Sequence, residues 1–166
     1  MEQHNPYQRP QAQVADVLPP DGLVPASRGK RLAAAIVDGL IALAVFIPIM
    51  IYGGYFTALA QGAGLMTQLG WGLFGLVLFF AIQFVPLNAS AQTWGKKVVG
   101  IRIVDMDGQQ PGLGVLMGRR YLFSNGIGLV PLVGGVLSIV NVLFIFRSDR
   151  RCIHDLVADT RVVEAD

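Results

Sequence analysis

The sequence predicts an all-α integral membrane protein: a small helical bundle with two full spans, a C-terminal helical hairpin and a short cytoplasmic β-hairpin-like element. Only 14% of the 166 residues are charged, against about a quarter in a typical soluble domain. No Lys or Arg lies between Arg31 and Lys96, and no charged residue lies between Arg120 and Arg147. Uncharged apolar runs of this length exclude a soluble secreted domain, a nucleic-acid binder and most soluble enzymes.

Residues 1–27 are predicted to form a disordered, Pro-rich cytoplasmic tail ahead of a membrane domain of residues 28–166. Five of the nine prolines lie in this tail, together with polar residues and few large apolar ones. Such a composition cannot bury enough apolar surface to offset the entropy lost on ordering. A signal peptide is not expected, because the basic cluster and the apolar run begin only near residue 28.

Two full spans are expected at Leu32–Tyr52 and Leu69–Leu87, joined by the uncharged, Gly-rich loop Gly53–Gln68. About 20 residues at a rise of about 1.5 Å cover the hydrocarbon core of about 30 Å. Basic residues precede the first span and follow the second. Because cytoplasmic segments carry the excess of Lys and Arg, the N-terminus is predicted to be cytoplasmic and the loop external.

The uncharged run Tyr121–Phe146 leaves two alternatives for the third membrane region. A single span, giving three spans in all, would carry the basic C-terminal residues outside, against the positive-inside rule. A hairpin of two short helices, Gly112–Val130 and Leu132–Phe146, returns them to the cytoplasm. One Pro and two Gly residues interrupt the run where the hairpin would turn. The hairpin is favoured, and accessibility mapping that places Asp166 outside would contradict it.

A short strand and turn are expected at the membrane surface between the second span and the hairpin. Apolar residues alternate with others over Val99–Val104, and Asp105–Gly108 has the composition of a turn. The segment Thr160–Glu164 contains two valines and is a candidate partner for this strand.

Asp38 is the only charged residue within the two spans and the strongest candidate functional residue. A carboxylate at this depth is costly in hydrocarbon, so it should face protein or water. Ala34 and Ala42 stand four residues before and after it and allow another helix to approach this face. Candidate partners in other spans are Gln83, Asn125, Ser138 and Asn141. Of these, Gln83, Asn125 and Asn141 would form a possible ion or proton site with Asp38. Their alternative role is ordinary hydrogen bonding between helices.

Arg31 and Asp38 lie on one face of the first span but too far apart for a direct ion pair. Seven residues separate them, which corresponds to about 10 Å along a helix axis. A polar group from another segment should therefore complete the cluster. Asp155 could pair with Arg31 or with Arg120, so the predicted functional polar cluster is Arg31, Asp38, Arg120 and Asp155.

No metal site, cofactor or enzymatic activity is predicted. Cys152 is the only cysteine, which excludes an internal disulfide and a multi-Cys metal site. His154 and the tail residue His4 are the only histidines, too few for a zinc site. No nucleophile–base pair and no phosphate-binding loop is recognisable.

These motifs together resemble the RDD family of small membrane proteins, whose name denotes one arginine and two aspartates. Arg31-x-x-Ala-x-x-x-Asp38 heads the first span, and His154-Asp155 begins the closing motif. The resemblance covers residues 28–163 and implies that Arg31, Asp38 and Asp155 are the name-giving residues. The other matching positions are Gln92, Thr93, Gly95, Lys96, Gly100, Asp105, Gly108 and Thr160. Before that Thr the family often has Gly, where this chain has Asp159.

Two functions follow from these predictions. The first is transport of a small ion, a cation or a proton, by the buried Arg/Asp cluster. Because three or four short helices hardly enclose a path, transport would require a homo-oligomer. The alternative is a non-transporting membrane interaction or assembly protein, in which the cluster is structural and a cytoplasmic protein is the partner. The expected location is the bilayer of the bacterial inner membrane, with both termini cytoplasmic.

Overall fold

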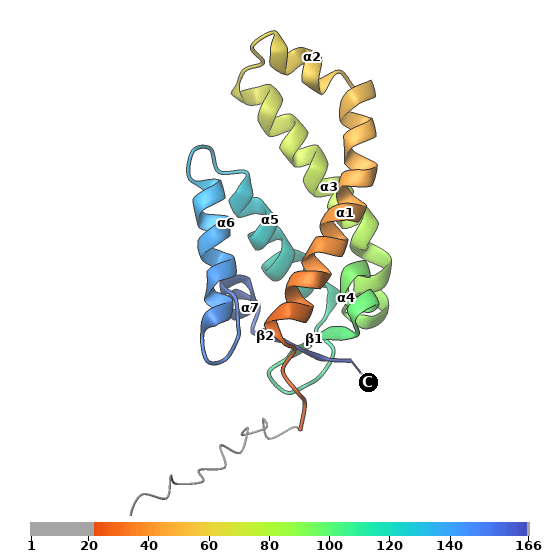
Figure 1. The fold of residues 1–166 in the computed structure, drawn as a ribbon, viewed down its shortest axis with the longest axis vertical. Coiled ribbons are helices and arrows are strands. Elements are labelled where there is room, and N and C mark those ends of the chain that lie inside the picture. Colours follow the sequence, from red (N-terminus) through yellow and green to blue (C-terminus); the bar gives the residue numbers. More distant parts are fainter. Residues whose placement is uncertain (1–21, 166) are drawn as a thin grey trace, which may run out of the picture.

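The computed structural model describes residues 22–165, which are mostly helical (Figure 1). Residues 1–21, most of the predicted tail, and Asp166 lie outside the described residues. The elements in chain order are α1 (Arg28–Tyr52), α2 (Tyr55–Ala60), α3 (Leu65–Ser90), α4 (Trp94–Val99), β1 (Ile101–Asp105), η1 (Val115–Leu122), α5 (Phe123–Gly128), α6 (Gly134–Leu143), η2 (Phe144–Phe146), α7 (Ile153–Val157) and β2 (Thr160–Glu164).

The helices α1 and α3 are each long and apolar enough to cross a membrane, and they contain the two predicted spans. Ser27 caps α1, because its hydroxyl accepts a hydrogen bond from the backbone N–H of Lys30 at 3.2 Å. Only 6% of the apolar stretch of α1 and 11% of that of α3 are buried. A core helix of a soluble protein would bury its apolar face. The two helices therefore indicate a membrane protein.

Aromatic side chains join α1 and α3 at the end of the molecule far from the sheet. The Phe46 ring lies 6.2 Å from that of Phe74 and 6.4 Å from that of Trp71. The predicted loop Gly53–Gln68 instead contains α2 and the first turn of α3. Its Ala, Leu, Met and Gln residues are good helix formers, which explains why the connection is helical.

The third apolar region turns back on itself, as the hairpin prediction required (Figure 1). The π-helix η1, with eight residues, continues into α5, with six. After a turn, α6 packs against α5. Gly134 permits the turn, because a Cβ there would lie 2.7 Å from the carbonyl oxygen of Ile127. At about 1.5 Å per residue, each arm is shorter than a full span.

A two-stranded antiparallel sheet lies at the end of the molecule opposite the aromatic contacts of α1 and α3. In this sheet Ile103 of β1 pairs with Val162 of β2. The predicted pairing of Thr160–Glu164 is thus confirmed, although the first strand begins at Ile101, because Val99 ends the helix α4. The buried apolar core lies around this sheet and includes Leu87, Ile101, Ile103, Leu116 and Val162.

Residues 24–26, which fall in the predicted tail 1–27, lie along the outer edge of β2. Pro25 forms a β-bridge with Val163, and the N–H of Ala26 donates to the carbonyl of Val162 at 3.0 Å. Ala26 is buried in the core. The fold therefore begins before residue 28. Backbone hydrogen bonds make this contact, and they leave no mark on side-chain composition.

Candidate functional site

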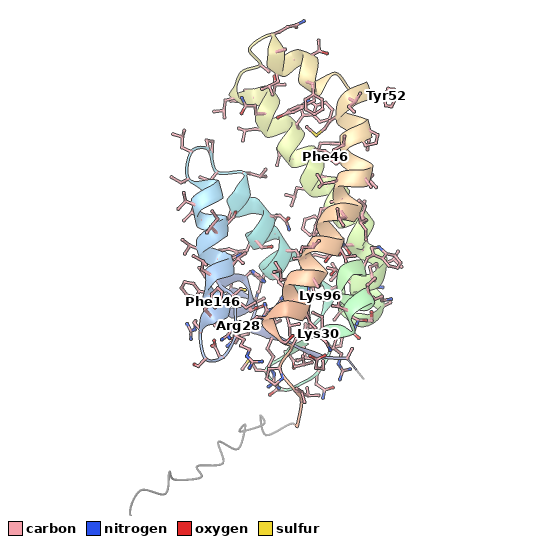
Figure 2. The ribbon with its side chains drawn as sticks, in the orientation of Figure 1. Arg28, Lys30, Phe46, Tyr52, Lys96 and Phe146 are labelled. Carbon is pink, nitrogen blue, oxygen red and sulfur yellow. The ribbon has the colours of Figure 1, made fainter. Side chains whose placement is uncertain are left out.

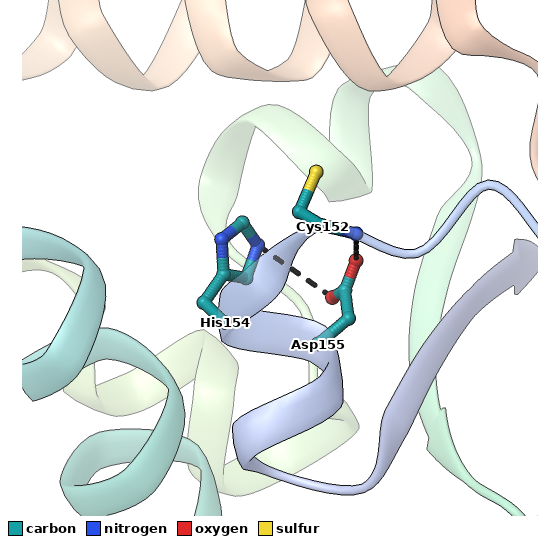
Figure 3. Close-up of side chains that lie close together, drawn as sticks. All are labelled: Cys152, His154 and Asp155. Atoms are coloured by element: carbon teal, nitrogen blue, oxygen red, sulfur yellow. Dashed lines mark hydrogen bonds and ion pairs between the residues drawn. The ribbon is translucent and has the colours of Figure 1, made fainter. Parts of the chain in front are cut away.

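The short helix α7 places Asp155 between two arginines from distant elements. Its Oδ2 lies 2.5 Å from Nη2 of Arg31, in α1, and its Oδ1 lies 2.5 Å from Nη2 of Arg120, in η1. Oδ2 also accepts a hydrogen bond from the backbone N–H of Cys152 at 2.8 Å, the contact marked in Figure 3. We call Arg31, Arg120 and Asp155 the Asp155 clamp, since it joins α1, η1 and α7.

The Asp155 clamp is buried and keeps a net positive charge. Asp155 is fully buried and Arg120 is 1% exposed. Burial alone would raise the pKa of Asp155, but the guanidiniums of Arg120 and Arg31 hold that pKa well below its usual range. One carboxylate thus balances two guanidiniums. Arg120 also donates to the hydroxyl of Thr160, while its Nε has no hydrogen-bond partner among the described residues.

Asp38 belongs to a second cluster, which joins α1, α3 and α4. Its Oδ1 accepts from Nε2 of Gln83 at 2.9 Å and from the N–H of Gly95 at 2.8 Å, and its Oδ2 accepts from the hydroxyl of Thr93 at 2.5 Å. Gln83 in turn accepts from the N–H of Trp94 at 3.1 Å. We call Asp38, Gln83, Thr93 and Gly95 the Asp38 cluster. Three donors therefore occupy the two carboxylate oxygens of Asp38, and no cationic side chain among the described residues forms an ion pair with them.

The close approach of α1 to α4 depends on Gly95. A Cβ at this position would lie 2.1 Å from the carbonyl oxygen of Ala34 and 2.9 Å from Cγ of Asp38. Thr93 caps α4, since its hydroxyl accepts from the N–H of Lys96 at 3.3 Å while donating to Asp38. The hydroxyl of Thr93 therefore links the start of α4 to the Asp38 cluster.

The structure divides the predicted site residues between these two clusters. Arg31, Arg120 and Asp155 meet in the Asp155 clamp, whereas Asp38 contacts Gln83 and neither arginine. The two asparagines of the predicted ion site bond elsewhere. The side chain of Asn125 donates to the carbonyl of Tyr121 at 2.9 Å, and that of Asn141 accepts from the N–H of His154 at 3.0 Å. Asp38 also accepts hydrogen bonds from Thr93 and Gly95, two partners that the sequence of the spans alone did not indicate.

The remaining motif residues shape turns and packing around these clusters. Gly100 and Gly108 have φ values of +68° and +81°, which glycine adopts without strain. Asp105 Oδ1 accepts two backbone N–H bonds within its turn. Gln92 donates to the carbonyl of Ile101 at 2.9 Å. Asp159 has a φ of +49°, which explains why a glycine suits this position.

Both clusters border one cavity of about 590 Å³ between α1 and the C-terminal hairpin. Four cationic side chains line it: Arg28, Arg31, Lys96 and Arg120. Among its described lining residues Asp38 is the only acid, and Asp155 lies behind the two arginines of the clamp. Neither Arg28 nor Lys96 forms an ion pair with a described carboxylate. The four cations thus outnumber the two carboxylates.

Cys152, His154 and Asp155 lie close together (Figure 3), with ligand atoms within 4.8 Å of one another. Both Asp155 oxygens already contact guanidiniums, and Nη2 of Arg31 lies 3.5 Å from the Cys152 sulfur. Burial raises the pKa of the Cys152 thiol, which disfavours the thiolate that binds metals. A metal cation here would face two arginines, so these residues do not fit a metal site.

His154 should make stability pH-dependent. Burial, and next the charge of Arg120, lowers the pKa of His154 to about 3. The charges of Arg31 and Lys96 lower this pKa further, whereas the charge of Asp155 raises it. The unfolded chain binds this proton near pH 6.5 and the folded chain does not. Stability should therefore fall as the pH drops from about 6.5 to 4, by at most about 1.4 kcal/mol per pH unit.

Thermal unfolding of detergent-solubilised wild type and His154→Gln across this pH range measures the effect. The variant should show a flatter pH dependence, because glutamine does not titrate. The tail histidine is present in both proteins and cancels from the difference. Parallel pH profiles would show that His154 does not remain neutral in the fold.

The RDD family model matches residues 25–159 of this chain. The uncharacterised protein YckC of Bacillus subtilis is 29% identical over 147 residues, covering 85% of each chain. An uncharacterised protein of Haemophilus influenzae is 27% identical over 154 residues, covering 92% of this chain and 86% of its own. The uncharacterised protein YxaI of Bacillus subtilis is 25% identical over 158 residues, covering 84% of this chain and 97% of its own. No solved structure matches the chain.

Proposed function

The chain belongs to the RDD family, and we propose that it is a non-enzymatic, multi-pass protein of the bacterial inner membrane that binds an anion in the cavity beside α1. In this proposal α1 and α3 span the bilayer, and the C-terminal hairpin enters it from the cytoplasmic side. The sheet and both termini are cytoplasmic, and α2 is external.

The distribution of charge supports this placement. Figure 2 shows Arg28, Lys30 and Lys96 near the end that carries the sheet, whereas Phe46 and Tyr52 lie toward the other end. Basic residues concentrate on the cytoplasmic side of membrane proteins. The same accessibility mapping of the C-terminus that distinguishes a hairpin from a single span tests this orientation.

The charge excess of the cavity is the observation that favours an anion. Arg28 and Lys96 have no described carboxylate partner, and the Asp155 clamp adds one further positive charge. Away from bulk water, a cationic side chain forms a strong charge-assisted hydrogen bond to an anionic oxygen.

A cation or proton carried by Asp38 is less well supported by the geometry. Three donors already occupy the Asp38 oxygens. A cation entering the cavity would also meet four positive side chains. We therefore propose an anion in place of the cation or proton, and movement across the bilayer would still require a homo-oligomer that completes a path.

The second candidate function is assembly with a cytoplasmic protein, with both clusters purely structural. The observation that favours it is the complete pairing of the Asp155 carboxylate with two arginines that come from other elements. Under this reading the cavity would bind no anion.

Titration with inorganic phosphate tests the proposal. We expect saturable binding to the purified full chain in an uncharged detergent, measured by calorimetry and by thermal stabilisation. Lys96→Gln should weaken this binding about tenfold or more, because a charge-assisted hydrogen bond contributes about 1.5–3 kcal/mol.

Lys97→Gln is the matched control. Lys97 is the neighbouring residue of α4 and lies over the Trp94 ring at 5.7 Å, away from the cavity lining. Equal effects of the two variants, or no saturable phosphate binding, would overturn the anion proposal. If sodium bound saturably and Asp38→Asn abolished that binding, the result would support a cation site at Asp38 instead.

A further inference from the structure

We propose that the occupant of this cavity is an anionic phospholipid of the surrounding bilayer, an inference that rests on the anion site proposed above. Its headgroup phosphate would lie among Arg28, Arg31 and Lys96. One of its acyl chains would lie farther along α1, between that helix and the C-terminal hairpin.

The length of the cavity is the first argument for an amphiphile. Its lining residues on α1 run from Arg28 to Ala42, mostly at spacings of three and four residues, so they form one face of the helix. That face extends about 21 Å along the helix axis. The cationic side chains of α1 lie in its first turn, whereas Leu32, Ala35, Gly39 and Ala42 line the rest, where Asp38 is the one charged residue of α1 and accepts hydrogen bonds from three donors. A small inorganic anion would leave this longer, apolar part unfilled.

The opposite wall comes from the hairpin. Its first arm contributes polar residues, including Ser124 and Asn125, whereas its second arm is apolar and contributes Val142, Ile145 and Phe146. Arg28 connects the two walls at the cationic end, because its Nε donates to the carbonyl of Ile145 at 3.1 Å and its guanidinium lies 5.6 Å from the Phe146 ring centroid. Figure 2 shows these two side chains together at the foot of α1. The cavity is therefore cationic where α1 begins and mainly apolar beyond it, with Asp38, Ser124 and Asn125 among its polar lining residues.

The packing of the helices leaves this apolar part to lipid. The most extensive contacts of α1 are with α4, and those of α6 are with α5. The cavity lies between these two pairs, and half of the residues of α1 that border it are small, including Ala35, Gly39 and Ala42. A bilayer lipid combines an anionic group at the depth of the basic residues with a chain at the depth of the apolar wall. A soluble anion or acidic peptide matches only the cationic end.

Delipidated full-length protein, titrated with phosphatidylglycerol or with phosphatidylcholine of the same chains, tests the inference. Native mass spectrometry measures bound lipid, and displacement of inorganic phosphate reports the shared site. We expect phosphatidylglycerol to bind about tenfold more tightly than phosphatidylcholine and to displace phosphate. Lys96→Gln should remove the preference for phosphatidylglycerol over phosphatidylcholine. If the Lys96→Gln protein does not fold, Arg28→Gln, at an exposed position, tests the same preference.

Ala42→Leu separates the lipid from a soluble anion. The added side chain enters the cavity about 16 Å along α1 from Arg31, so phosphate binding should be unchanged while phosphatidylglycerol binding falls severalfold. Lys97→Gln should leave both unchanged. Phosphate binding that phosphatidylglycerol does not displace would overturn the lipid inference and leave the anion proposal standing. Equal binding of both lipids would also overturn the inference, whereas loss of all binding, phosphate included, would overturn both proposals.

Discussion

Asp155→Asn is expected to destabilise the protein by about 3–5 kcal/mol, one of the two largest effects expected of a single substitution. The substitution keeps the size of the side chain but removes the carboxylate charge that faces Arg31 and Arg120. Arg120 would then be a buried cation without a counter-charge, and breaking a buried pair in this way costs several kcal/mol. The apparent melting temperature in mild detergent should fall by roughly 10 °C.

Asp149→Asn provides the control for this experiment. Asp149 also pairs with an arginine, Arg147 at 3.2 Å, but both side chains are exposed to solvent. Exposed pairs contribute about 0–1 kcal/mol, so this variant should melt close to wild type. If the two variants melt alike, the Asp155 clamp does not hold the elements together.

Gly95→Ala is expected to have a similarly large effect, because it inserts one methyl group where the α1 backbone already lies. The new Cβ would lie 2.1 Å from the carbonyl oxygen of Ala34, so α1 and α4 must separate. Their separation would break the hydrogen bond from the Gly95 N–H to Asp38. Overpacking costs about 1–3 kcal/mol and the lost hydrogen bond to a charge about 1.5–3 kcal/mol more.

Gly70→Ala is the matched substitution for comparison by thermal unfolding. Gly70 lies in α3 with nothing within 4 Å of an added Cβ, and alanine favours helix over glycine. This variant should be neutral or slightly more stable. A Gly95→Ala protein as stable as Gly70→Ala would show that α1 and α4 can separate without cost.

The sequence predicts features that depend on local pattern or on charge distribution. Long uncharged runs locate α1 and α3, and an interrupting proline with the basic residues beyond it predicts the hairpin. The partners of Asp38 are harder to predict. Gln83 lies on a predicted span and could be proposed, whereas Thr93 and Gly95 lie on a connection whose path depends on the packing of α4.

Two other features depend on backbone geometry that side-chain pattern does not encode. Residues 24–26 pair with β2 through backbone groups. Arg120, which pairs with Asp155, lies in the π-helix η1, and the hydrogen-bond register that distinguishes a π-helix from an α-helix is not encoded by residue type. The sequence predicts that Asp155 pairs with either Arg31 or Arg120, and in the structure it pairs with both.

The Asp155 clamp can form only after the long segment between Arg31 and Asp155 has been translated. Arg31 and Asp155 are 124 positions apart, and at about 5–20 residues per second a ribosome takes roughly 6 to 25 s to cover that distance. During that interval Arg31 lacks its final partner. Because α7 follows the hairpin in the chain, the Asp155 clamp forms only after both α1 and η1 have been translated.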